Sequence, residues 1–131
     1  MPTTASLAQH RLPIILSCHC KRIQLSISEE PEFLTECNCS LCRRYGALWA
    51  YFSPSSVKLR CQEAQLRQYI QGDKTLAVNA CNTCFCITHW HTLQEQANAK
   101  MGVNFRLAQE SLSQQYTIRH LDGANTWTYL D

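Results

Sequence analysis

The sequence predicts a mainly β fold with one or two short helical turns. Apolar and polar residues alternate along several short segments, which is the period-two pattern of half-buried strands. Turn signals such as Ser53-Pro54-Ser55-Ser56 separate these segments. At 131 residues the chain has the size of one domain, so we expect a single domain over residues 1–131.

The first expected strand is residues 22–28, where Ile23, Leu25 and Ile27 would share one face. Further short segments rich in aromatic or β-branched residues follow it. They are residues 48–52, 57–61, 66–70, 76–80 and 86–93. Helix is expected only in one turn over residues 40–44 and in a short piece near residues 109–115. Residues 116–119 and 126–129 flank the turn signal Asp122-Gly123, and the rest of the chain after residue 94 shows no clear pattern.

Seven of the nine cysteines fall into three clusters with the spacing of metal ligands. The clusters are Cys18-x-Cys20, Cys37-x-Cys39-x-x-Cys42 and Cys81-x-x-Cys84, the last followed by Cys86. Alternate residues of an extended segment leave from one face, so Cys18 and Cys20 could hold one ion together. A tight turn would point the sulfurs of Cys81 and Cys84 inward in the same way.

Two pairs and a triplet provide the ligands of one closed metal site and one open metal site. A structural Zn²⁺ has four Cys or His ligands, whereas a catalytic Zn²⁺ has three protein ligands and keeps one position for water or substrate. We therefore expect two Zn²⁺ ions per chain, one held by both pairs and one by the triplet. Redox-active or plain buried thiols are the alternatives, and a redox triplet would leave a single tightly held metal.

The composition argues against several functional classes. The net charge is +2 without a long basic run, so we expect no nucleic acid partner. No apolar stretch approaches the ~20 residues of a membrane-spanning helix, so we expect no membrane association. The start, Met1-Pro2-Thr3-Thr4-Ala5-Ser6, lacks a basic segment, and the apolar run at residues 12–16 is too short for a secretion signal. Clustered cysteines with an odd total fit a reducing compartment, so we expect a cytoplasmic protein.

The residues around the clusters resemble the glutathione-dependent formaldehyde-activating, or aldehyde-activating, proteins of the centromere protein V superfamily. The resemblance covers most of residues 14–93 and rests on Ser17-Cys18-His19-Cys20, on the sequence CNCSLCRRYGA at residues 37–47, and on Cys81-Asn82-Thr83-Cys84. It implies a zinc-built, mostly β fold with small antiparallel sheets, often called a β-tent. It also implies that the structural zinc binds Cys18, Cys20, Cys81 and Cys84, and that the functional zinc binds Cys37, Cys39 and Cys42.

Two positions depart from the family pattern. Members commonly have Gly directly after the first C-x-C and after the C-x-x-C, where this chain has Lys21 and Phe85. Gly is usual where φ must be positive or where two backbones approach closely. Lys21 and Phe85 therefore imply somewhat different turns at the structural zinc, although neither replaces a ligand.

An open zinc with three thiolates would favour a soft fourth ligand such as a substrate thiol, which would lose its proton on binding. The held thiolate could then add to an aldehyde carbonyl and form a hemithioacetal. The resemblance implies that the thiol is glutathione and that the aldehyde is formaldehyde. The protein would be a zinc-dependent carbon–sulfur lyase or synthase. The alternative is a non-catalytic zinc-binding domain that carries a small thiol or meets a protein partner.

Two arginines and several aromatic residues are candidates for supporting roles. Arg43 or Arg44 could bind a glutathione carboxylate or offset the charge of the anionic zinc cluster. Tyr45 and the aromatic residues at positions 49–52 could wall a pocket, but aromatic residues on a short strand are more often core. We therefore expect them to belong to the core. No residue beyond the zinc ligands is predicted to be catalytic.

The remaining histidines and cysteines are expected to have structural or minor roles. His89 and His91 share one strand face, and we expect surface or supporting roles for them rather than metal ligation. His19 lies between two ligands and should point away from the zinc. Cys86 should be a small buried residue near the structural pair, and Cys61 should belong to the core.

Overall fold

The computed structural model of the chain describes residues 12–72, 74–94 and 98–131. The strands are β1 (Ile14–Ser17), β2 (Gln24–Ile27), β3 (Leu34–Cys37), β4 (Trp49–Phe52), β5 (Val57–Arg60), β6 (Leu66–Ile70), β7 (Leu76–Cys81), β8 (Ile87–Thr92), β9 (Met101–Asn104) and β10 (Ile118–Leu121). The α-helices are α2 (Ser40–Tyr45) and α3 (Glu110–Ser113), and 3-10 turns cover Pro54–Ser56, Glu63–Gln65 and Phe105–Leu107. Residues 1–6, which lack the basic segment of a secretion signal, lie outside the described residues.

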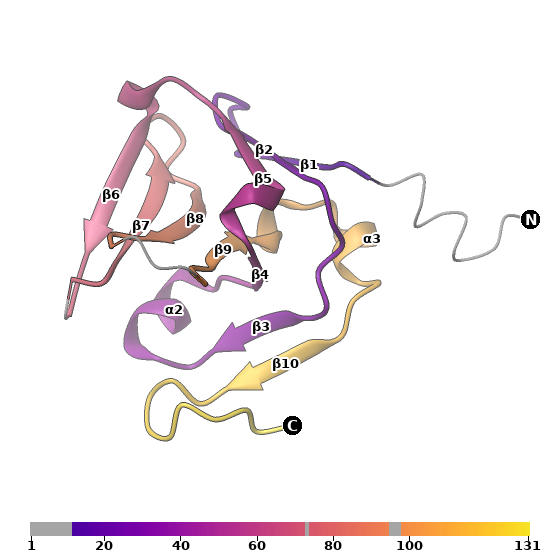
Figure 1. The fold of residues 1–131 in the computed structure, drawn as a ribbon, viewed down its shortest axis with the longest axis vertical. Helices are drawn as coiled ribbons and strands as arrows, with labels where there is room; N and C mark the ends of the chain where they lie inside the picture. Colours follow the sequence, from indigo (N-terminus) through magenta and orange to yellow (C-terminus); the bar gives the residue numbers. More distant parts are fainter. Residues whose placement is uncertain (1–11, 73, 95–97) are drawn as a thin grey trace, which may run out of the picture.

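The strands form two sheets (Figure 1). The smaller sheet has the order β1-β2-β5, and the larger has the order β10-β3-β4-β9-β8-β7-β6. Strand pairs are antiparallel apart from β10 and β3, which run in parallel. The predicted mainly β class with two short helices is confirmed, with one parallel pair added. No helix in the described part of the chain is both long and apolar enough to span a membrane.

The strands that alternation predicts are present, and three further strands escaped prediction. The sequence of β1 is part of a short apolar run without alternation, and β3, with the sequence LTEC, is too short to show a period. All four residues of β9 are buried, so this strand has no alternation to detect. After β10 the chain turns at Asp122, and residues 126–129 form a loop with one isolated bridge between Leu121 and Tyr129 instead of a strand.

The hydrophobic core lies between the two sheets. Leu25 and Ile27 on β2 point inward, as the alternation predicts, and both are fully buried. Ala50 and Phe52 on β4 come from the larger sheet and belong to the same core. The third member of the predicted apolar face, Ile23, packs instead against the cysteines Cys18 and Cys81. Burial on β2 therefore supports both the core and a cysteine cluster.

The opposite face of the larger sheet bears a row of four paired residues, the aromatic row, in which Tyr51 and Trp90 are aromatic. Tyr51 on β4 pairs with Gly102 on β9, which pairs with Trp90 on β8, which in turn pairs with Val78 on β7. Directly paired residues of neighbouring strands share one face of a sheet, so this row lies on the side away from the core. A Cβ atom on Gly102 would overlap the indole of Trp90, so glycine at this position lets the indole lie flat across β9.

Candidate metal centres

The four-cysteine cluster consists of Cys18, Cys20, Cys81 and Cys84, whose sulfur atoms all lie within 4.8 Å of one another. Cys18 and Cys20 follow β1, Cys81 ends β7, and Cys84 lies in the turn before β8. The Sγ atoms of Cys18 and Cys20 are 3.6 Å apart, and those of Cys20 and Cys81 are 3.5 Å apart. Sulfurs arranged tetrahedrally on zinc, with bonds of about 2.3 Å, would be roughly 3.8 Å apart. This donor set therefore fits a tetrahedral thiophilic ion.

The turns at the four-cysteine cluster have the backbone conformation that glycine usually adopts. Lys21 has φ of 68° and Phe85 has φ of 65°, both in the left-handed region. The expectation of different turns at these positions was wrong, because the side chains are accommodated without changing the turn. The turns also direct backbone N–H groups at sulfur: the amides of Ile23 and Thr83 donate to Cys18 and Cys81, each over 3.4 Å.

The three-cysteine cluster consists of Cys37, Cys39 and Cys42, whose sulfurs also lie within 4.8 Å of one another. Cys37 ends β3, Cys39 caps α2, and Cys42 lies within α2. The amide of Cys39 donates to the Cys37 sulfur over 3.5 Å, and the amide of Cys42 donates to the Cys39 sulfur over 3.2 Å. No other described Cys, His, Asp or Glu joins this cluster, which therefore offers three ligands instead of four.

The pKa values of the clustered thiols are shifted in opposite directions. Burial raises the pKa of Cys18 to about 11 and that of Cys42 to about 12. For Cys84 burial also opposes ionisation, but hydrogen bonds, first from the backbone of Cys86 and Cys20, outweigh it and lower the pKa to about 5. Cys39 likewise has a lowered pKa despite burial, mainly because the Cys42 amide donates to it. Ionising every thiol in such a group requires a positive charge among the sulfurs, which a metal ion supplies.

The loop after β10 packs directly against the three-cysteine cluster. A Cβ atom on Gly123 would lie 2.5 Å from the Cys37 sulfur and 3.3 Å from the Cβ of Cys39. Asp122 holds this loop in place, because the Asn38 side chain donates to its carboxylate over 3.0 Å. The Ala124 amide donates back to the Asn38 side chain over 2.9 Å. The predicted turn signal at Asp122-Gly123 thus forms part of the wall of the candidate site.

An aromatic pocket of about 150 Å³ opens beside the three-cysteine cluster. The three cysteines line it together with Tyr45, Trp49, Tyr51, Trp90 and Trp127, and the other lining residues are Leu41, Gln71, Leu76, Val78 and Leu121. Trp49 is buried, as the core prediction requires, but its indole N–H donates to the Cys42 sulfur over 3.4 Å. The expectation that positions 45, 49 and 51 are core alone was therefore incomplete. The chain also places Trp90 and Trp127 here, which no local signal in the sequence indicated.

Comparison with known proteins identifies the family. The family model of the glutathione-dependent formaldehyde-activating enzyme matches residues 13–120. The chain belongs to this family. A crystal structure of a Rhodobacter sphaeroides protein is similar, with 25% sequence identity and a TM-score of 0.65, and the alignment covers 80% of this chain and 98% of that one. A search of curated proteins found no match.

In this member of the formaldehyde-activating family, residues outside the two clusters match their predicted positions only in part. Both arginines of α2 are exposed, and the Arg44 guanidinium donates to the Ser40 carbonyl over 2.7 Å. His19 is exposed, as expected. Cys86 and Cys61 are half-buried and pack against the four-cysteine cluster, so they are less buried than predicted.

The two histidines of β8 lie apart from both clusters. His89 is buried, which differs from a surface position, and its Nδ1 lies 2.9 Å from the Thr88 hydroxyl. His91 is half-buried, with Nδ1 2.9 Å from the Asn79 side-chain nitrogen. Burial lowers the pKa of His89 to about 4 and also lowers the pKa of His91. Both side chains belong to a polar network on the sheet face opposite the aromatic pocket.

Proposed function

We propose that the protein is a zinc-dependent carbon–sulfur lyase or synthase that catalyses reversible addition of a small thiol to a small aldehyde. Family membership supports glutathione and formaldehyde as the reactants. The observation that best supports the site is the three-cysteine cluster at the edge of the aromatic pocket. A zinc ion held by these three protein donors would keep one position for a reactant, and the three cysteines line the pocket.

We propose two zinc ions per chain. The four-cysteine cluster would hold a structural ion, which its sulfur spacing and half-buried to buried environment support. The three-cysteine cluster would hold the second, open ion. When bound there, zinc supplies Lewis acidity and stabilises the thiolate form of an incoming thiol.

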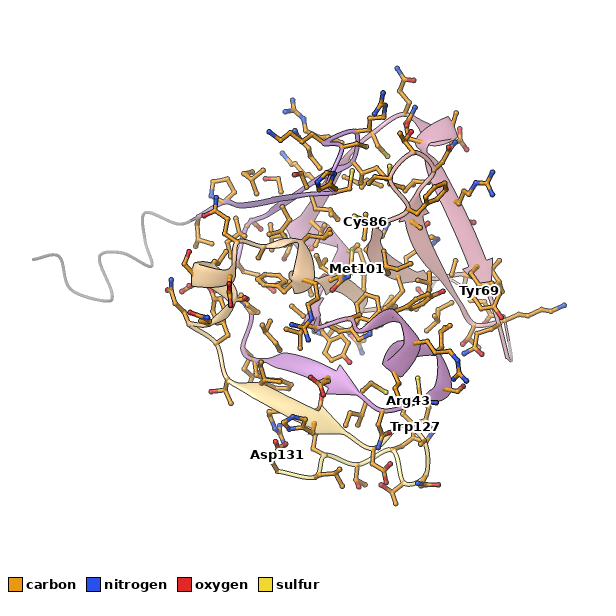
Figure 2. The ribbon with its side chains drawn as sticks, turned by 180° about the vertical axis from the view of Figure 1, so that it is seen from behind. Arg43, Tyr69, Cys86, Met101, Trp127 and Asp131 are labelled. Atoms are coloured by element: carbon orange, nitrogen blue, oxygen red, sulfur yellow. The ribbon has the colours of Figure 1, made fainter. Side chains whose placement is uncertain are left out.

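The side chains around the three-cysteine cluster would bind and orient the reactants. The Trp49 indole N–H stabilises negative charge on Cys42, and the aromatic walls would shield one side of a bound reactant from solvent. Arg44 is engaged with its own helix, so Arg43 is better placed to bind a carboxylate of the thiol. Figure 2 shows Arg43 on the same side of the molecule as Trp127, a residue that lines the pocket.

The reaction needs no oxidant or reductant. In the forward direction a bond forms between the thiol sulfur and the carbonyl carbon, and the carbon–oxygen π bond breaks. The proton lost by the thiol is balanced by the proton that the new hydroxyl oxygen gains. In the reverse direction the carbon–sulfur bond breaks and the aldehyde is released. The same site therefore supports synthase and lyase activity.

The same cysteines support a proposed cellular setting and domain organisation. All nine cysteines are free thiols, and seven of them gather in the two clusters. Metal ligation by thiolates fits a reducing compartment, which supports a cytoplasmic location. We also propose that residues 1–131 act as a single domain, because the four-cysteine cluster connects the smaller sheet to β7 of the larger one.

Zinc content and sulfur coordination test this proposal. The purified protein should contain about two zinc ions per chain, and titration with glutathione should add a sulfur neighbour in zinc X-ray absorption spectra. Formation of S-hydroxymethylglutathione from ¹³C-formaldehyde is then followed by NMR. One zinc per chain would favour redox thiols, whereas thiol binding without accelerated adduct formation would favour a carrier.

A matched pair of variants assigns the activity to the three-cysteine cluster. Cys39→Ser should fold and retain about one zinc ion per chain. Glutathione should no longer change its zinc X-ray absorption spectrum. Cys61→Ser should behave like the parent protein, because Cys61 lies outside both clusters. Unchanged glutathione binding in Cys39→Ser would refute the assignment of this site.

A further inference from the structure

We propose that the aromatic pocket binds an uncharged, ring-sized apolar group of one reactant, so that the preferred substrate is an aromatic or similarly bulky aldehyde or thiol. The inference rests on the proposed function and specifies its substrate class. On this inference, formaldehyde and glutathione are not the complete set of reactants.

The size of the pocket matches one aromatic ring. Its volume is about 150 Å³. An apolar cavity of about 150 Å³ in another protein holds one benzene molecule. Formaldehyde has only two heavy atoms and would leave most of this space empty. A whole glutathione molecule would not fit inside and would have to extend into solvent, where Arg43 is exposed.

The walls of the pocket favour an uncharged occupant. Within the ranges that the structure describes, no Asp, Glu, Lys or Arg lines the pocket. The rings of Tyr51 and Trp90 lie 5.9 Å apart at 55°, so an occupant meets aromatic faces and edges. The Trp90 ring lies across β9 because Gly102 has no side chain. A carboxylate placed among these side chains would lose part of its hydration without meeting a cationic partner.

Trp127 forms the outer part of the pocket in an unusual way. It lines the pocket although its side chain is 71% exposed, and its backbone has φ of 56°. The amide of Trp127 donates to the Asp122 carbonyl over 2.7 Å, which fixes this conformation. Residues in such sparsely populated backbone conformations cluster at active sites and ligand clamps. A ring in the pocket would bury part of this indole.

The position of the pocket connects ring binding to the reaction. The sulfurs of Cys37, Cys39 and Cys42 line one side, and the aromatic row on the sheet lines another. A ring packed on Trp90 and Tyr51 would present its attached carbonyl or thiol to the cysteine side. The added thiol proton again ends on the hydroxyl oxygen, so the balance of the reaction is unchanged.

Ligand titrations of the zinc-loaded protein test the inference. The probes are benzaldehyde, 4-carboxybenzaldehyde, formaldehyde, benzyl mercaptan and the unreactive benzyl alcohol, and the readout is the NMR signals of the tryptophan indole N–H groups. We expect benzaldehyde or benzyl mercaptan, together with benzyl alcohol, to bind at least tenfold more tightly than 4-carboxybenzaldehyde. If benzaldehyde binds more tightly than benzyl mercaptan, the aldehyde has the ring. If benzyl mercaptan binds more tightly, the thiol has it. Equal affinity for the charged and uncharged rings would overturn the inference.

Variants that fill the pocket localise the binding. Val78→Phe should weaken benzyl alcohol binding at least tenfold, and Leu76→Phe, at a half-buried position of the same strand, serves if Val78→Phe does not fold. Leu59→Phe on the smaller sheet is the control and should leave binding unchanged. Unaltered affinity in a folded pocket variant would overturn the inference.

The two proposals can fail separately. If the protein binds two zinc ions and glutathione but does not discriminate between the rings, the substrate class is wrong and the proposed function stands. If the uncharged ring binds in the pocket but zinc content and adduct formation do not depend on Cys39, the proposed function is wrong. In that case the ring-binding pocket remains.

Discussion

The indole N–H of Trp49 donates a hydrogen bond to the sulfur of Cys42 across 3.4 Å. Trp49 lies on β4 and Cys42 on α2, so this bond connects the larger sheet to the helix that presents the three-cysteine cluster. Burial raises the pKa of Cys42, and the indole N–H opposes that shift. The bond therefore favours the thiolate form that a metal ion requires.

Trp49→Phe removes this donor and keeps an aromatic ring in the pocket. We expect a folded protein whose three-cysteine cluster binds zinc about tenfold more weakly, because partners of metal ligands typically change affinity by 10-fold or more. Competition with a chelator measures the affinity. Trp127→Phe is the control, since Trp127 is exposed. Equal zinc affinity in Trp49→Phe and the parent would contradict the role of this hydrogen bond.

Cys84→Ser should lower the free energy of unfolding by about 4 kcal/mol or more, as expected for loss of a structural metal. Cys18→Ser should have a similar effect. Denaturant unfolding in the presence of zinc measures both. Cys61→Ser removes a thiol that packs against the same cluster but does not belong to it, and it should cost much less. A stability close to that of the parent in Cys84→Ser and Cys18→Ser would refute the four-ligand assignment.

Phe85→Gly should raise the free energy of unfolding by about 1 kcal/mol. Phe85 has φ of 65°, which disfavours L-residues with a side chain, and its ring is 68% exposed, so little packing is lost. Urea unfolding measures the gain. Phe85→Ala is the matched control because it removes the ring but keeps the unfavourable conformation, and we expect no gain from it. A gain of the same size in both variants would point to the exposed ring as the cause.

The pKa of His89 should lie below the ordinary histidine value, and the pKa of His120 should lie above it. Burial lowers the pKa of His89 to about 4, so between about pH 4 and 6.5 the unfolded chain binds the proton and the folded chain does not. His89 therefore makes the protein less stable as the pH falls through this range. A hydrogen bond to Asp131 at 2.7 Å raises the pKa of His120.

Ring-proton NMR spectra recorded as a function of pH measure the pKa values of both histidines. Asp131→Asn should return the His120 pKa toward its ordinary value and leave His89 unchanged. An ordinary pKa for His89 in the parent protein would contradict its buried, neutral state.

The sequence could predict the cysteine clusters because ligand spacing within each cluster is a local property. Cys37, Cys39 and Cys42 span the end of one strand and the first turn of one helix, so their convergence needs no long-range information. Alternation likewise revealed β2 and β4 to β8. Strand β9 could not be found this way, because burial of all four residues leaves no polar face.

The aromatic pocket could not be predicted because it depends on strand register. Trp90 reaches the pocket through its pairing with Gly102 and Val78, which come from two other strands. Trp127 reaches it through a loop whose path is set by hydrogen bonds to Asp122. Lys21 and Phe85 show that a local preference can also mislead. Because glycine is preferred at such positions, their side chains suggested different turns, but both residues adopt the positive φ that glycine usually has.

The loop that covers the three-cysteine cluster begins where the match to the family model ends. The match ends at residue 120, whereas Gly123 and Trp127 lie beyond it. Of the residues that line the pocket, Leu121 and Trp127 lie in this terminal stretch, whereas the three cysteines lie within the match. On the proposed function, exchanging this short terminal stretch between members would alter the Trp127 side of the pocket and leave the three cysteine ligands in place.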